Sequence, residues 1–111
     1  MNRLFVLVDR EPVEVDDLHV WGQRFEADDR IVDRTEVAPG VVVSTVFLGI
    51  DHSWRDDGPP ILFETIVFDQ LAGDGDPDRY STWSEAEAGH AATVARMKAA
   101  RRGGPGDPSG T

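Results

Sequence analysis

Two long apolar runs, at residues 41–50 and 61–68, form the strongest pattern in this chain. Both runs are rich in valine, isoleucine and phenylalanine, which favour β-strands, and both contain a few polar residues. The stretch between them ends in Gly58-Pro59-Pro60, a sequence typical of a loop. The pattern therefore predicts two neighbouring strands joined by that loop.

The N-terminal part predicts one more strand and a helix. Residues 4–8 form a short apolar run, and Pro12 argues against extending it as a central strand. A helix is predicted over about residues 17–29, with Asp16 as its N-cap. Apolar side chains recur there at helical spacing, and we expect them to face the core: Leu18, Trp21 and Phe25.

Residues 31–38 alternate less cleanly between apolar and charged positions, as an edge strand with a solvated face would. Pro39-Gly40 fits the two central positions of a type II turn, because proline fixes φ and glycine accepts a positive φ. The run from Val41 would then pair back on this strand. The three consecutive strands are predicted to form an antiparallel meander.

The C-terminal part begins with a predicted loop, residues 71–80, in which aspartate alternates with glycine and proline. This loop lacks the flanking helices and the final glutamate of a helix–loop–helix calcium site. Thr82 and Glu85 have the spacing of a capping box, which predicts a helix over about residues 83–100. Residues 101–111 are predicted to be a disordered Gly/Pro-rich tail.

These elements, in the order β-α-β-β-β-α, predict a single α+β domain of two layers over residues 1–100. Its four-stranded, mainly antiparallel sheet would carry two helices on one face. Both long strands are apolar on both sides, so we expect the second face of the sheet to be covered as well. A homodimer would cover it.

The chain has a formal net charge of −10 over 111 residues. This charge repels phosphate backbones, so we do not expect direct nucleic-acid binding. Solubility explains the charge more simply than imitation of nucleic acid, which would require carboxylates lined up on one face. The apolar run at residues 4–8 is too short for a signal peptide or a membrane span, so we expect a cytoplasmic protein that does not bind membranes.

His90 is the most interesting single residue, because helical spacing places it on the side of the last helix that faces the sheet. It could be a core histidine bonded to a strand side chain, or a histidine that faces a cleft and acts near neutral pH. Glu64 and Thr65 project to opposite faces of their strand, so only one of them can meet the helices. If Glu64 and His90 share a face, they form either a buried structural pair or half of a general-base site.

A second group of candidates lies on loops, where binding residues concentrate. Trp54, next to Arg55 and near His52, could stack on a planar ligand or anchor a protein interface. Arg79 and Tyr80 precede the last helix and could lie at the same end of the molecule. With His90, the predicted ligand- or partner-binding residues are therefore His52, Trp54, Arg55, Arg79 and Tyr80.

Motifs for other chemistry are absent. The chain has no cysteine, which excludes disulfides and thiolate chemistry. It also lacks the histidine spacing of a zinc site, a phosphate-binding glycine loop and a serine nucleophile elbow. We therefore expect no metal, no cofactor and no assigned catalytic residue.

Three phrases carry a resemblance to a known family: residues 43–52, residues 60–68, and residues 79–90 with their Arg-Tyr-Ser-Thr-Trp start. They resemble a family of small, acidic, largely uncharacterised accessory proteins of bacteriophages and related mobile elements, especially those of high-GC actinobacterial hosts. The resemblance covers most of residues 1–100. It implies a cytoplasmic accessory product in a bacterial host and attaches no activity to any residue.

Small accessory proteins of this kind commonly work by stoichiometric binding, so we expect a non-enzymatic binding protein. Its target would be a host protein, bound for inhibition or counter-defence, or a small nucleotide signal that it sequesters. A host protein is favoured, because an anionic nucleotide would have to overcome the negative charge. The alternative is a small hydrolase or lyase that uses Glu64 and His90 as acid and base.

Overall fold

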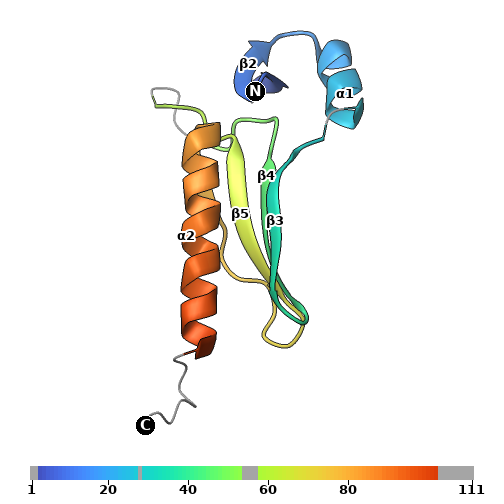
Figure 1. The fold of residues 1–111 in the computed structure, drawn as a ribbon. Helices are drawn as coiled ribbons and strands as arrows, with labels where there is room; N and C mark the ends of the chain where they lie inside the picture. Colours follow the sequence, from blue (N-terminus) through green and yellow to red (C-terminus); the bar gives the residue numbers. More distant parts are fainter. Residues whose placement is uncertain (1–2, 28, 54–57, 103–111) are drawn as a thin grey trace.

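A computed structural model describes residues 3–27, 29–53 and 58–102 of the chain (Figure 1). The fold is α+β, as predicted, with two helices and a four-stranded antiparallel sheet. The elements in chain order are β1 (Leu4–Val8), β2 (Glu11–Val15), α1 (Leu18–Ala27), β3 (Ile31–Ala38), β4 (Val41–Phe47), β5 (Phe63–Asp69), β6 (Asp78–Tyr80) and α2 (Trp83–Arg102).

The four-stranded sheet has the order β3-β4-β5-β6, so each strand pairs with its neighbour along the chain. The predicted meander of the first three strands is confirmed. Gly40, with φ of 79°, lies in the two-residue turn between β3 and β4, as the Pro39-Gly40 pair predicts. Helix α2 runs along one face of this sheet (Figure 1). Alternate residues of β4 are buried, because its odd-numbered side chains lie under the helix.

The capping box at the start of α2 is also confirmed. The amide of Glu85 donates to Thr82 Oγ1, and the amide of Thr82 donates to Glu85 Oε1, each at 3.1 Å. Helix α2 continues to Arg102, two residues into the segment predicted as a disordered tail. The remainder of that predicted tail, residues 103–111, lies outside the described residues. Neither described helix is long and apolar enough to cross a membrane.

The N-terminal part differs from the prediction, because β1 does not belong to the four-stranded sheet. It forms a hairpin with β2, a strand that the sequence reasoning missed. The turn consists of Asp9 and Arg10, with φ of 50° and 70°. A two-residue hairpin turn requires such positive φ values, but the pair Asp-Arg is not one of the sequences that predict this turn. Pro12 is tolerated because β2 lies at the edge of the hairpin.

Three further corrections concern the sheet and the helices. The fourth strand of the large sheet is β6, a three-residue strand within the segment predicted as a loop. The helices do not share one face: α2 packs on the large sheet, whereas α1 packs on the hairpin (Figure 1). The N-cap of α1 is Asp17 instead of Asp16, since Asp17 Oδ1 accepts from the amide of His19 at 2.9 Å.

The hairpin and α1 dock on the large sheet at Gly49, just beyond the end of β4. The carbonyl of Gly49 accepts from the amide of Phe5 at 2.8 Å and from Trp21 Nε1 at 3.0 Å. Gly49 has φ of 78°, and a Cβ there would lie 2.8 Å from the Phe25 ring. Trp21 and Phe25 stack with their centroids 4.6 Å apart. Both are only half-buried, and no residue of α1 is fully buried.

The core lies where the hairpin, the large sheet and the start of α2 meet. It consists of Phe5, Phe47, Leu62, Phe63 and Ala86, each at most 5% exposed. This cluster joins the two sheets into one body.

Candidate functional site

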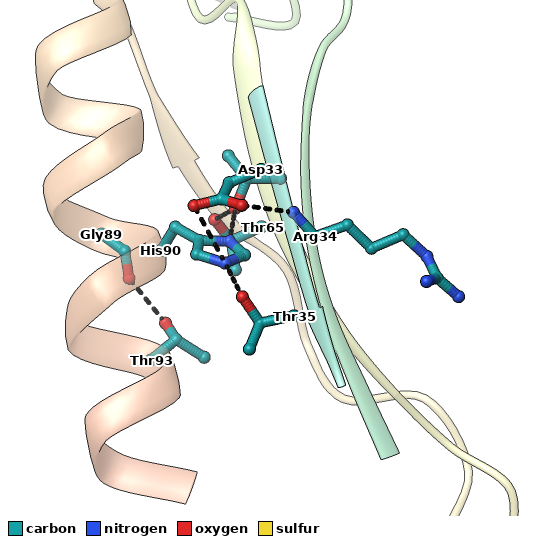
Figure 2. Close-up of polar contacts among 8 residues, drawn as sticks. Asp33, Arg34, Thr35, Thr65, Gly89, His90 and Thr93 are labelled. Carbon is teal, nitrogen blue, oxygen red and sulfur yellow. Dashed lines mark hydrogen bonds and ion pairs between the residues drawn. The ribbon is translucent and has the colours of Figure 1, made fainter. Parts of the chain in front are cut away.

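His90 lies inside the molecule, between α2 and the large sheet. Its side chain is 3% exposed. Nδ1 lies 2.8 Å from Thr45 Oγ1, and Nε2 lies 2.9 Å from Thr35 Oγ1. Figure 2 shows the imidazole reaching from the helix to the strands. Both ring nitrogens therefore have hydroxyl partners, as a buried polar side chain requires.

The hydroxyl network extends across three strands. Thr45 Oγ1 lies 2.6 Å from Thr65 Oγ1, and both side chains are buried. At the rim, the exposed Asp33 places Oδ2 3.7 Å from His90 Nε2, a longer contact than a hydrogen bond. Thr35, Thr45 and Thr65 occupy β3, β4 and β5, so the network connects α2 to the three long strands.

Helix α2 approaches β6 closely because residue 89 is a glycine. A Cβ at Gly89 would overlap the hydroxyl of Tyr80. On the same turn of the helix, Thr93 Oγ1 donates to the carbonyl of Gly89 at 2.8 Å (Figure 2). Tyr80 thus packs on the helix one residue away from His90.

Glu64 lies on the opposite face of the sheet from His90. Thr65 takes the position towards α2, so its neighbour Glu64 must point the other way. There Glu64 Oε2 pairs with Arg79 Nε at 3.0 Å. The proposed acid–base pair of Glu64 and His90 is therefore not assembled. The buried His90 cluster also offers no open approach for a substrate while α2 stays packed.

The loop after β4 is organised by Asp51, a residue that the sequence reasoning did not rank highly. Its Oδ1 accepts from the amides of Ser53 at 2.8 Å and Ile61 at 2.9 Å. Burial of this carboxylate acts to raise its pKa, but hydrogen bonds from the two amides and from the Ser53 side chain, together with the charge of Arg3, hold the pKa below its ordinary value. Asp51 therefore closes the base of the loop that carries His52.

Of the binding residues that were predicted and that the structure describes, Tyr80 packs next to His90, whereas His52 and Arg79 lie apart from them. The side chain of His52 is exposed, whereas its amide donates to the Ile61 carbonyl at 2.9 Å. Trp54 and Arg55 lie outside the described residues. Arg79 and His90 lie on opposite faces of the sheet. Within the described ranges, no group of three histidine or acidic side chains is placed to hold a metal ion.

Two surfaces stand out beyond these residues. The first is the face of the large sheet turned away from α2, which we call the open face. Its apolar side chains come from three adjacent strands: Ile31, Val42, Val46, Ile66 and Phe68. Phe68 is 43% exposed and Ile31 is 48% exposed. The side chains of Val42, Val46 and Ile66 between them are half-buried, and the five together make this face a candidate interaction surface.

The second surface surrounds the connection between β2 and α1. Three exposed apolar residues, Val13, Leu18 and Val20, lie there close in the chain to the acidic Asp16 and Asp17, and we call this group the β2–α1 surface. Leu18 and Val20 are two positions apart on α1, so their side chains point to different sides of the helix. Leu18 is 67% exposed, and the two valines are 43% and 42% exposed. Both aspartates are also exposed. Apolar side chains interleaved with carboxylates suit a protein partner better than a small anion.

Sequence reasoning predicted a covered second face of the sheet but missed the β2–α1 surface, for a physical reason. Periodicity shows that an apolar face exists but not whether another element covers it. The apolar character of both sides of the long strands was a partial signal for the open face.

Comparison of the chain with models of known protein families, with curated proteins and with solved structures finds no match. The resemblance to phage accessory proteins therefore stays an expectation drawn from the sequence.

Proposed function

We propose that this chain is a non-enzymatic accessory protein of a phage or mobile element that binds a protein of its bacterial host stoichiometrically. It would act in the host cytoplasm, by inhibition or counter-defence, and its binding unit would be a homodimer. The observation that carries this proposal is the β2–α1 surface. Leu18 projects from the first position of α1, and 67% of it is exposed.

Leu18 is exposed at the start of α1, next in the chain to the exposed carboxylates of Asp16 and Asp17. A partner that covers Leu18 removes apolar area from water, at about 25 cal/mol per Å². The same partner would meet Asp16 and Asp17 at the rim. A protein surface with apolar side chains surrounded by lysine or arginine satisfies both requirements.

The charge of the N-terminal part supports this choice of partner. Residues 3–31 contain four described arginines and seven described carboxylates. The arginines all make contacts within the chain. Arg3 pairs with Glu14 at 3.0 Å, Arg10 and Arg30 lie over the rings of Trp83 and Phe25, and Arg24 donates to the Leu7 carbonyl at 2.7 Å. The excess negative charge is therefore presented outwards.

Quantitative capture from a lysate of an actinobacterial host tests this proposal. Tagged wild-type protein is compared with Leu18→Asp and with Leu71→Asp, a control at a leucine that is 99% exposed elsewhere. Aspartate in the first turn of a helix is favourable, so Leu18→Asp should fold. We expect one host protein to be captured by the wild type and the control, with at least a tenfold loss in Leu18→Asp.

Two further measurements make the test specific. Native mass spectrometry of the isolated complex should show one partner per protomer. Binding should also weaken as salt is raised, because the contact joins acidic and basic surfaces. If no captured protein depends on Leu18, the proposal is wrong.

A further inference from the structure

The open face forms a regular grid, which the strand registers define. One row runs from Glu36 through Val42 to Phe68, and the next from Arg34 through Ser44 to Ile66. In the third row, Val46 lies opposite Glu64, which in turn lies opposite Arg79. The rows place apolar side chains in the middle of the face and charged ones along its edges.

No described helix packs across this face. Helix α2 lies on the other side, and α1 packs on the hairpin beyond the end of the sheet (Figure 1). The tail is a poor cover, because residues 103–111 contain no large apolar side chain. What covers Phe68 and its neighbours must therefore bring its own apolar surface.

The charge of the open face points to a second copy of the chain. Within these rows Arg34 and Arg79 balance Glu36 and Glu64, and Glu64 already pairs with Arg79 at 3.0 Å in the same chain. Asp69 and Asp74 border Val42 and Phe68 at one end of the face, so only the rows themselves are formally neutral, while the whole chain carries −10. Two copies of this acidic chain repel each other over most of their surfaces, and the repulsion is smallest between two such neutral rows.

The size of the open face sets the expected strength of a contact between two copies. Neighbouring strands lie about 4.8 Å apart and rise about 3.4 Å per residue, so the three long strands and β6 together span about 400 Å². Two such faces together cover about 800 Å², less than the roughly 1,200 Å² at which stable specific interfaces begin. The contact therefore suits a weak, reversible dimer.

We infer that the open face is the interface of a symmetric dimer of this chain, with the two large sheets packed face to face and Phe68 at the contact. This inference rests on the homodimer of the proposed function and assigns its interface to the open face. The helices then lie on the outside, as in a four-layer α-β-β-α arrangement. The β2–α1 surface is not part of the open face, so in the dimer each protomer still has its own surface for a host protein.

Sedimentation velocity of the purified protein over about 5–500 µM tests the inference across the expected affinity range. The variants are Phe68→Lys, Val42→Lys in the neighbouring strand, and the control Leu71→Lys. Thermal unfolding confirms that each variant is folded. We expect a concentration-dependent dimer for the wild type and the control, and at least a tenfold weaker dimer for Phe68→Lys and Val42→Lys.

Salt provides a second readout. The dimer should tighten when sodium chloride is raised from about 0.05 to 0.5 M, because salt screens the repulsion between two acidic chains. A wild type that stays monomeric throughout overturns both the inference and the proposed homodimer, while host-protein capture through Leu18 is judged separately. If the protein still dimerises with either lysine substitution, the proposed homodimer stands, but the open face is not its interface.

Discussion

Thr45 Oγ1 lies 2.8 Å from His90 Nδ1, so a hydrogen bond inside the molecule joins a central strand of the large sheet to helix α2. The same hydroxyl lies 2.6 Å from Thr65 Oγ1 on the next strand. His90 also reaches Thr35 on β3. From these contacts we expect His90 to act as a structural residue that fixes the position of α2 on the sheet.

Replacement of His90 by alanine should therefore be strongly destabilising. The change leaves Thr35 and Thr45 without their imidazole partner and opens a cavity, so we expect the free energy of unfolding to fall by about 2–4 kcal/mol. Urea unfolding measures the loss. His52→Ala is the matched control, because its side chain is exposed, and it should change stability by less than about 0.5 kcal/mol. Equal effects at the two histidines would contradict the structural role.

Alanine at Gly89 should destabilise the protein, although alanine favours helices over glycine by about 1 kcal/mol. The new Cβ would overlap the Tyr80 hydroxyl and push β6 away from α2. Gly22→Ala in α1 is the matched control, since nothing lies within 4 Å of its Cβ position. Thermal unfolding should show a lower melting temperature for Gly89→Ala and an unchanged or higher one for Gly22→Ala. A stabilised Gly89→Ala would show that the helix does not approach Tyr80 so closely.

Asp51 should make stability depend on pH at the acidic end. Burial acts to raise its pKa, but the amides of Ser53 and Ile61, the Ser53 side chain and the charge of Arg3 together lower it below the ordinary value. Its stabilising contribution is therefore complete above the unfolded pKa of about 3.9 and is lost as the pH falls through the folded pKa.

Urea unfolding of wild type and Asp51→Asn between about pH 7 and pH 2 isolates this contribution. We expect the wild type to be more stable at neutral pH by about 1–2 kcal/mol, because charged acceptors bind amides more strongly than neutral ones. The difference should shrink as the carboxyl group is protonated. A difference that stays constant with pH would contradict the role of the charge.

The sequence predicted those parts of the fold whose signals are local. The runs that contain β4 and β5 are dense in β-branched residues, and the Thr82–Glu85 box fixes the start of α2 through neighbouring groups alone. By contrast, β6 contains Asp78 and Arg79, which have little strand preference. It forms because Phe63–Thr65 offers a free edge for pairing.

The candidate site was predictable only in part. Helical spacing placed His90 towards the sheet, and the structure confirms this. The hydrogen-bond partners of His90 depend on which side chains of each strand face the helix. A shift of one residue in strand register moves every side chain to the other face of the sheet. The choice between Glu64 and Thr65 was therefore open in the sequence, and tertiary packing selected Thr65.

Photo-crosslinking in an actinobacterial host tests the central claim, stoichiometric binding to a host protein, most directly. A photoreactive phenylalanine analogue is placed at position 18, 68 or 71 in separate variants, and adducts are identified by mass spectrometry. We predict one host-protein adduct from position 18, an adduct between two copies of the chain from position 68, and no specific adduct from the exposed position 71. Absence of a host-protein adduct from position 18, or the same adducts from all three positions, would contradict the account.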